Sequence, residues 1–576
     1  MSIPSSVCTA PQATDCDTEF VTCTRSTRSN ELLVARFLRQ QSEGGVCRVV
    51  SEAGPLSANA LWSKAQAYRA VMRAHGLERG GVVVIALPTS SNVLAILLAA
   101  WCDGCAISLV AHEIADHSGR LSPSRFGQML AAVSPAIVLT TPEVAEHVPL
   151  AQRRHVVLVD ELERQASALG HALSEPVQAR DSDIAILQFT SGSTNVPKVA
   201  PITQAMLAAN CAAIAERIAL GSADKMVSWL PLHHDMGLSA VTLAWWGGVE
   251  LVLLPTAMFV RQPLSWLEAI SMHRATLSPA PASAYSVLSR FAQSAVQKQL
   301  DLSSWRYAWA GAEPVFHKHL EQFAQRMRPL GLRANVLQPS YGMAEAVVAV
   351  SLNEPDRAYR TVWLDASALH ERFAVLLREP GSAGAIACVS NGRPVSGVEV
   401  QIRGLGAAHC GESQAGAICI RGTSVIGDYL GLGRACDDQG WFDTGDIGFV
   451  LDGEVFISGR AKDVITRAGL NVSAHDVEWA IEELLSLKEG SVAAFSYVEP
   501  ELAQERVVAV VAKQPGPAQA EQLRRAISVA VAMRSGLQLD EILFVPRSSI
   551  PKTTSGKIQR AALRSAHLRG ELASVA

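Results

Sequence analysis

The sequence Leu187-Gln-Phe-Thr-Ser-Gly-Ser-Thr-Asn-Val-Pro-Lys198 joins the end of an apolar run to a turn rich in hydroxyl groups. The run predicts the end of a strand. In the turn, small residues let backbone N–H groups approach an anion closely, and hydroxyl groups donate further hydrogen bonds. The turn therefore predicts a polyphosphate site, although a Ser/Thr-rich surface turn would have the same composition. Its candidate ligands are Thr190, Ser191, Gly192, Ser193, Thr194 and Lys198.

The composition indicates a multidomain globular enzyme. A chain of 576 residues is too long for one hydrophobic core, so we expect two or more domains. The net charge is −4 and no basic block occurs, which argues against nucleic acid or an anionic membrane surface as a partner. The eleven cysteines are odd in number and sparse, which predicts mostly reduced thiols in a cytoplasmic protein.

Neither a signal peptide nor a membrane span is expected. Residues 1–28 lack a basic start followed by an apolar run and are predicted to be a flexible tail. The most apolar window, Val93–Trp101, is shorter than the roughly 20 residues of a membrane helix. It is better interpreted as a buried helix.

Strands and helices alternate along the first third of the chain. Strands are predicted at Val82–Leu87, Ala106–Val110 and Ala136–Thr140, with helices at Ser91–Trp101 and Ser124–Val133 between them. This order predicts an α/β fold in which helices cover both faces of a parallel sheet.

One motif in this region has two interpretations. Trp101-Cys-Asp-Gly-Cys105 has the spacing of a redox-active dithiol, or contains two core cysteines where a helix ends. A redox site should open a helix, whereas Cys102 and Cys105 close one. The spacing of the elements therefore favours core cysteines.

Several later strands end in turns that carry polar residues. A strand from Val227 runs into Pro231 and is followed by His233, His234 and Asp235. Adjacent side chains rarely reach one ion, so a role other than metal binding is favoured, and a hydrogen-bonded core histidine also fits.

Two further turns follow strands predicted at Trp305–Ala310 and Ala334–Leu337. Ligands in open α/β sheets bind beyond the carboxyl ends of strands. There, Tyr341 offers a ring for stacking and Glu345 a carboxylate for a hard cation.

The second half divides into an insertion and a small α+β unit. Residues 355–386 have mixed polarity and predict a short strand and the helix Ala366–Phe373. Asp452-Gly453 predicts a hairpin, Ser473 with Asp476 a variant capping box, and Arg274–Leu277 a strand. We expect a large domain at 29–460 and a small domain at 461–576.

Five motifs, in this order, resemble those of the ANL superfamily of adenylate-forming enzymes. The resemblance covers roughly residues 30–565 and implies a large adenylation domain of stacked sheets and helices with a small, mobile α+β domain. The motifs are Thr190–Lys198, Tyr341-Gly-Met-Ala-Glu345, Thr444-Gly-Asp446, Gly459-Arg-Ala-Lys-Asp463 and Pro551-Lys-Thr-Thr-Ser-Gly-Lys557.

Within the superfamily, the chain is most similar to fatty acyl-AMP ligases. The similarity rests on Trp229–Leu238, on Ala344 before Glu345, and on Arg360–Leu369 within the insertion. It implies that the insertion restrains the small domain and disfavours coenzyme A. The acyl group would then pass to the phosphopantetheine thiol of an acyl carrier protein.

The resemblance also implies how ATP and Mg²⁺ would be bound. The Thr190–Lys198 loop would bind the β- and γ-phosphates, Asp446 the ribose hydroxyls, and Arg460 the ribose or a phosphate. Glu345 would bind Mg²⁺. The adenine pocket would consist of Gly311, Ala312, Glu313, Tyr341 and Gly342.

For the chemical step, the resemblance implies that His234 lies beside the acyl carboxylate and that Lys557 bridges this carboxylate and the α-phosphate. Lys462 matches the position about which the small domain turns. The bulky Trp245 and Trp246 lead us to expect a short acyl tunnel and a medium-chain or unusual acid. The alternatives are an acyl-CoA or aryl-CoA synthetase and a non-catalytic carrier-binding relative.

Overall fold

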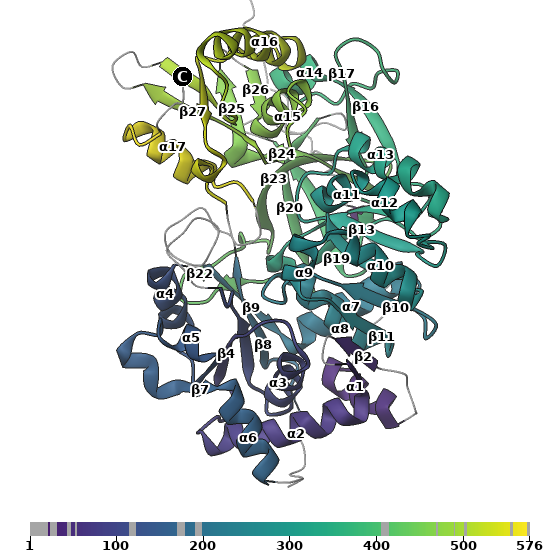
Figure 1. The fold of residues 1–576 in the computed structure, drawn as a ribbon, viewed down its shortest axis with the longest axis vertical. Helices are drawn as coiled ribbons and strands as arrows, with labels where there is room; N and C mark the ends of the chain where they lie inside the picture. Colours follow the sequence, from purple (N-terminus) through teal and green to yellow (C-terminus); the bar gives the residue numbers. More distant parts are fainter. Residues whose placement is uncertain are drawn as a thin grey trace, which may run out of the picture.

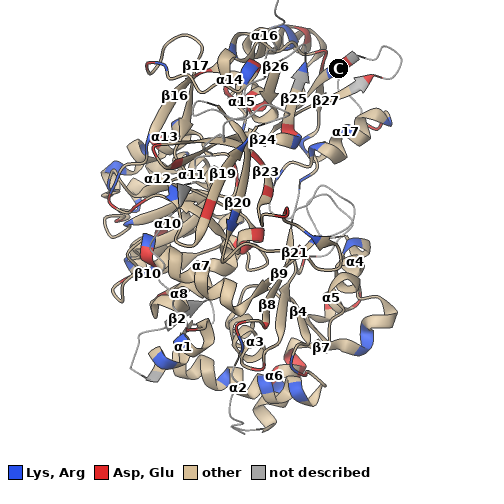
Figure 2. Ribbon diagram, turned by 180° about the vertical axis from the view of Figure 1, so that it is seen from behind, with Lys and Arg blue, Asp and Glu red and all other residues tan. Residues whose placement is uncertain are grey.

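The computed structural model confirms the α/β fold (Figure 1). It describes residues 21–22, 31–42, 48–51, 54–113, 122–169, 179–190, 198–404, 414–467, 470–488, 490–499, 504–552 and 557–572. None of the helices in these ranges is both long and apolar enough to cross a membrane. Basic and acidic residues are interspersed along the ribbon of these elements (Figure 2).

A six-stranded sheet carries the predicted alternation of strands and helices. Its order is β7-β6-β4-β5-β8-β9, and all neighbouring pairs are parallel except β8 with β9. The helix predicted as buried, α3 (Ser91–Cys102), is buried from Val93 onward. The strands are β4 (Val82–Ala86), β5 (Ala106–Leu109), β6 (Ile137–Thr140), β7 (Val156–Leu158), β8 (Ile184–Thr190) and β9 (Lys198–Thr203).

A nine-stranded sheet lies beside it, in the order β18-β15-β14-β13-β12-β10-β11-β2-β3. The strands in chain order are β2 (Arg48–Ser51), β3 (Gly54–Ser57), β10 (Lys225–Ser228), β11 (Glu250–Leu253), β12 (Leu277–Pro281), β13 (Tyr307–Gly311), β14 (Leu337–Gly342), β15 (Ala349–Leu352) and β18 (Arg393–Pro394).

Two of these strands begin later than predicted and run through prolines. Proline has no N–H group, which is why sequence patterns argue against it in central strands. In β12, pairing with β10 is limited to Met226 and Leu277. On that side, Pro279 and Pro281 therefore lie beyond the paired residues and break no hydrogen bond of the ladder. In β14, pairing with β15 begins only at Ser340, after Pro339.

Helices pack around the two sheets. α8 begins directly after His234 and packs against α7 and α1. The helices of this part are α1 (Leu33–Ser42), α2 (Ala58–Ala74), α4 (Pro123–Val133), α5 (Pro142–Ala145), α6 (Val159–Leu169), α7 (Gln204–Arg217), α8 (Asp235–Gly247), α9 (Thr256–Arg261), α10 (Leu264–His273), α11 (Ala282–Ser289), α12 (Ala292–Gln297) and α13 (His317–Met327).

A five-stranded antiparallel sheet follows, in the order β1-β19-β20-β23-β24. The predicted hairpin is confirmed: Asp452 and Gly453, with φ of +52° and +78°, join β23 to β24. β1 pairs with β19, so that Val21 lies opposite Val400. The strands are β1 (Val21–Thr22), β19 (Val398–Arg403), β20 (Gly416–Gly422), β23 (Phe442–Leu451) and β24 (Glu454–Arg460).

The elements from Val464 onward have their own hydrophobic core, which includes Ile465, Val477 and Phe544. The capping box predicted for α15 is wrong: Ser473 is the N-cap, but its side chain makes no capping bond. The elements are β25 (Val464–Arg467), β26 (Leu470–Ser473), α15 (Ala474–Leu484), β27 (Val492–Glu499), β28 (Gln504–Ala512), α16 (Pro517–Ser535), β29 (Glu541–Val545) and α17 (Arg560–Leu568).

The segment predicted as an insertion forms β16 (Thr361–Asp365), α14 (Ala366–Arg372) and β17 (Ala385–Val389). α14 contacts β26 and α16 of the C-terminal unit (Figure 1). The imidazole Nε2 of the buried His370 lies 3.5 Å from Oδ2 of Asp476 on α15. Asp476 thus faces the insertion rather than the backbone of its own helix.

Candidate active site

The strand that opens the hydroxyl-rich turn is paired with the strand that closes it. Thr190 at the end of β8 lies opposite Lys198 at the start of β9. Ser191, Gly192, Ser193 and Thr194 lie outside the described residues. The hairpin thus sets the spacing between its two ends.

Tyr429 connects this hairpin to Glu345. The ammonium group of Lys198 lies 4.8 Å from the ring centroid of Tyr429, within the range of a cation–π interaction. The Tyr429 hydroxyl donates a 2.8 Å hydrogen bond to Oε1 of Glu345. Sequence reasoning missed Tyr429 because its strand, β21 (Asp428–Tyr429), is too short to show a periodic pattern.

Glu345 is held in place by its main chain as well as by Tyr429. It lies in the short helix η3 (Ala344–Ala346), and its main-chain oxygen accepts a 2.9 Å hydrogen bond from Ile426. The described residues contain no cluster of three ligands that would hold a metal ion by itself. A single carboxylate suits Mg²⁺, which usually combines one or two carboxylates with substrate phosphates.

Asp446 accepts hydrogen bonds from side chains on two other strands. It accepts a 2.8 Å hydrogen bond at Oδ2 from the Tyr341 hydroxyl, and a 2.7 Å bond at Oδ1 from Nε of Arg460. Asp446 and Arg460 face each other across the β23–β24 ladder. Burial, reinforced by Asp446, raises the pKa of Tyr341, so that its hydroxyl remains a donor.

The turns after β13 and β14 need their small residues. A Cβ on Gly311 would lie 2.7 Å from the Ser340 hydroxyl, and a Cβ on Gly342 only 1.7 Å from the Val348 carbonyl oxygen. Ala312 adopts φ +63°, in the left-handed region. The two strand ends are therefore held close together beside Tyr341.

The carboxylate of Glu313 is directed at the first turn of α11. It accepts a hydrogen bond from the backbone N–H of Ser283. Burial raises the pKa of Glu313, while Lys557 and Lys552 act in the opposite direction. Glu313 thus combines a capping role with a position close to Lys557.

His233 and His234 form a pair of neutral imidazoles at the start of α8. Their ring centroids are 4.4 Å apart, and the Nε2 atom of each is buried without a hydrogen-bond partner among the described residues. Burial lowers the pKa of His233 to about 3 and that of His234 to about 4, and Lys557 contributes to the second shift. At neutral pH, both rings have hydrogen-bonding capacity available for a ligand.

Lys557 comes from the C-terminal unit yet lies among groups of the other elements. Burial lowers its pKa, and so does the neighbouring Arg460. Asp235, Glu313 and Asp446 act in the opposite direction, so their carboxylates lie within electrostatic reach of the ammonium group. By contrast, the side chain of Lys462, in the short helix η4 (Ala461–Asp463), is exposed.

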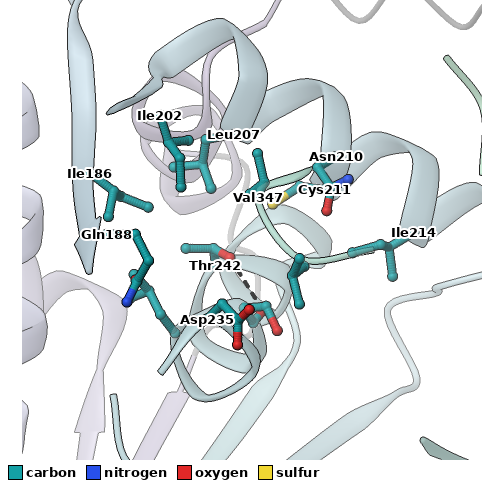
Figure 3. A pocket seen from close by; sticks show the side chains of 13 residues that line it. Ile186, Gln188, Ile202, Leu207, Asn210, Cys211, Ile214, Asp235, Thr242 and Val347 are labelled. Carbon is teal, nitrogen blue, oxygen red and sulfur yellow. Dashed lines mark hydrogen bonds between the residues drawn. The ribbon is translucent and has the colours of Figure 1, made fainter. Parts of the chain in front are cut away.

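A narrow cavity lies between β8, β9, α7 and α8 (Figure 3). Asp235, which directly follows His234, lines it, and so do Leu238 and Thr242 from the next turns of α8. One further turn on, Trp245 is fully buried and packs against Phe37 and Trp101. Other lining residues include Ile186, Gln188, Ile202, Leu207, Asn210, Cys211, Ile214 and Val347.

The structure argues against the redox interpretation. Cys102 and Cys105 are both buried, and burial raises the pKa of their thiols to about 12 and about 11. A reactive cysteine needs a lowered pKa and access to solvent.

Known proteins match both the sequence and the fold. The profile of the family described as "AMP-binding enzyme" matches residues 39–430. A Caulobacter vibrioides protein, provisionally named an acyl-CoA synthetase, is 35% identical over 398 residues and covers 67% of this chain and 69% of its own. The medium-chain-fatty-acid–[acyl-carrier-protein] ligase JamA of Moorena producens is 33% identical over 422 residues, covering 70% of this chain and 71% of its own.

Structural similarity extends into the C-terminal unit. A structure described under studies of fatty acyl-adenylate ligases from E. coli and L. pneumophila has a TM-score of 0.83 at 27% identity. It covers 94% of this chain and 98% of its own. The chain belongs to the AMP-binding enzymes of the ANL superfamily, and it is an AMP-forming ligase related to the fatty acyl-AMP ligases.

Proposed function

We propose that the protein uses ATP to convert a fatty or related carboxylic acid into an acyl-adenylate, and then transfers the acyl group to the phosphopantetheine thiol of an acyl carrier protein. The observation that carries this proposal is the convergence of Lys557, His234 and Asp446, which come from distant parts of the chain. Their charges and hydrogen-bonding groups match those of the reacting groups.

In this proposal, the β8–β9 turn and Lys198 bind the β- and γ-phosphates, and Glu345 holds Mg²⁺. A bound Mg²⁺ would neutralise phosphate charge during displacement. Asp446 binds the ribose hydroxyls beside Arg460. The closely packed turns Gly311–Glu313 and Tyr341–Gly342 hold the adenine.

The first reaction joins two anions. A carboxylate oxygen forms a bond to the α-phosphorus, and the bond from that phosphorus to the oxygen bridging it to the β-phosphate breaks, which releases pyrophosphate. The Lys557 ammonium group reduces the repulsion between carboxylate and phosphate and stabilises charge on phosphorus. The neutral His234 orients the carboxylate by a hydrogen bond without adding charge.

The second reaction transfers the acyl group. A thiolate attacks the activated carbonyl carbon, and AMP leaves. We assign residues 29–460 and 461–576 to a large and a small domain that turn about Lys462 in the cytoplasm. The contact of α14 with β26 and α16 supports a role for residues 355–386 in restraining that movement and so in disfavouring coenzyme A.

The large apolar side chains of α8 lead us to propose a medium-chain acid as the substrate. Trp245 is fully buried on the helix that begins directly after His234, where it would close a short acyl site. The name of the Moorena relative points to the same class of acid and acceptor.

The decisive experiment is ATP–pyrophosphate exchange over a panel of acids from about six to sixteen carbons, whose span brackets the roughly 15 Å from Asp235 to Trp245 along α8. We expect exchange to be greatest with medium-chain acids. Absence of exchange with every acid would refute the function, and a preference for the longest acids would refute a short acyl site closed by Trp245. Adding coenzyme A or a phosphopantetheinylated carrier protein then identifies the acceptor: equal transfer to coenzyme A would favour the acyl-CoA synthetase alternative.

A further inference from the structure

Arg560 makes a buried set of ion pairs three residues after Lys557. Its Nε and Nη2 atoms donate to the two carboxylate oxygens of Glu478 at 2.8 and 2.7 Å. Its Nη1 atom donates to Oδ2 of Asp463 at 2.9 Å. The side chains of Arg560, Asp463 and Glu478 are only 12%, 18% and 7% exposed, so this network is shielded from solvent.

The residues between Lys557 and Arg560 are themselves held in place. Ile558 forms a β-bridge with Lys552. The backbone N–H of Gln559 donates to Pro551 at 2.9 Å, and its side-chain amide donates to the carbonyl of Lys552 at the same distance. Arg560 then begins α17. A displacement of Arg560 would therefore carry the backbone of Lys557 with it.

The two partners of Arg560 lie in segments that connect the C-terminal unit to the rest of the protein. Asp463 directly follows Lys462 in η4. Glu478 lies on α15, and another stripe of the same helix contacts the rest of the protein. There, Asp476 approaches His370, and the Trp479 ring stacks on Phe316 with centroids 5.3 Å apart.

We propose that Arg560 is a positioning residue, which couples the Lys462–Asp463 segment and α15 to Lys557 so that the C-terminal unit presents Lys557 to the reacting groups as one rigid body. The expected effect on catalysis rests on the proposed function. The coupling of Arg560 to the position of Lys557 does not depend on that function. Lysine cannot replace arginine there, because only the planar guanidinium group bridges both carboxylates at once.

The test compares Arg560→Lys with Arg467→Lys. Arg467 forms an ion pair with Asp540 within the same C-terminal unit, which makes it a matched control for the loss of a guanidinium group. Because Lys557 lowers the pKa of His234, that pKa reports the position of Lys557. We would measure it by histidine-selective NMR, with His234→Gln for assignment and Lys557→Met for the full effect.

We expect the pKa of His234 to rise in R560K by most of the increase seen in K557M, and to stay unchanged in R467K. The kcat of acid-dependent exchange should fall by about tenfold to a hundredfold in R560K with little change in the KM for ATP, the scale of a misplaced catalytic group. Transfer from preformed acyl-adenylate to a thiol should be less affected.

An unchanged pKa of His234 in R560K, or equal losses of exchange in R560K and R467K, would overturn the proposal. Should R560K fail to fold, D463N provides the same comparison with a smaller change. If the unmodified protein shows no exchange at all, the proposed function fails, while the NMR measurement still decides whether Arg560 positions Lys557.

Discussion

The two sides of the candidate site are built in different ways. On one side, hydrogen bonds of 2.7–2.8 Å join Asp446 to Arg460 on the neighbouring strand and to Tyr341 on a strand of another sheet. On the other, Lys557 reaches the site from the C-terminal unit, which is anchored to the rest of the protein through α15 and the insertion. One side is held by strands of two packed sheets, and the other depends on how the C-terminal unit docks.

This difference separates two tasks. Recognition of a nucleotide profits from groups that need no rearrangement on binding, because preorganisation reduces the entropy lost. In the proposed function, Lys557 acts in adenylation and not in transfer, and a group with such a role profits from a movable support. Damage to the fixed side should therefore affect binding first, and damage to the docked side should affect the rate of the adenylation step.

The largest effect is expected for Lys557→Ala. Loss of the ammonium group should lower the rate of acid-dependent ATP–pyrophosphate exchange by about a hundredfold to a thousandfold, the scale seen when one group that stabilises transition-state charge is removed. The dissociation constant for ATP, measured by calorimetry, should change little. Exchange retained at more than a tenth of its original rate would contradict the role of Lys557.

A smaller effect, on binding rather than rate, is expected for Asp446→Asn. Hydrogen bonds to charged groups contribute about 1.5–3 kcal/mol, so loss of the carboxylate should raise the KM for ATP roughly tenfold to a hundredfold. Thr444→Ala is the milder comparison, because Thr444 accepts a 3.1 Å hydrogen bond from the backbone N–H of Asp446. A normal KM in D446N would show that the fixed side does not bind ribose.

The histidines between the two sides should make stability depend on pH. Their pKa values in the folded protein, about 3 and about 4, lie below the ordinary 6.5, so the unfolded chain binds more protons in acid. The two histidines do not destabilise the folded protein above pH 6.5. Below pH 6.5, the free energy of unfolding decreases because protons bind to the unfolded chain. Each histidine should lower the free energy of unfolding by up to about 2 kcal/mol between pH 7 and pH 5.

Thermal unfolding of the wild type, H233Q and H234Q at pH 7 and pH 5 tests this dependence. Each substitution should reduce the loss of Tm between the two pH values. If both variants lose as much as the wild type, the two rings are not held neutral by burial.

The smallest effect is expected for the double substitution of Cys102 and Cys105 by alanine. Both thiols are buried away from the site, so acid-dependent exchange should stay within about twofold, and only a modest loss of stability should follow. Sensitivity of the wild type, but not of this variant, to a thiol oxidant would revive the redox interpretation.

The sequence predicted those features that depend on local pattern. The alternation around Val82–Thr140, the Asp452–Gly453 hairpin and the C-terminal helix and strands follow from apolar periodicity and turn chemistry. Which residues meet in space does not follow from spacing. Tyr429 beside Glu345, Asp476 beside His370, and Arg560 between Asp463 and Glu478 all join segments far apart in the chain.

Proline caused the clearest errors of strand placement. Pro279, Pro281 and Pro339 argue locally against central strands, yet each lies in one. The structure accommodates these prolines because, on one side of each strand, the hydrogen-bonded ladder ends before the proline or begins after it. The extent of a ladder depends on the whole sheet, so a local stretch of sequence does not predict it.

The pairing of β1 with β19 has a consequence for biosynthesis. Val21 leaves the ribosome well before its partner Val400, which lies about 380 residues further along the chain. At about 5–20 residues per second, the first strand waits on the order of tens of seconds for its neighbour. During this interval this edge of the sheet remains incomplete, and β1 can pair only once β19 has been made.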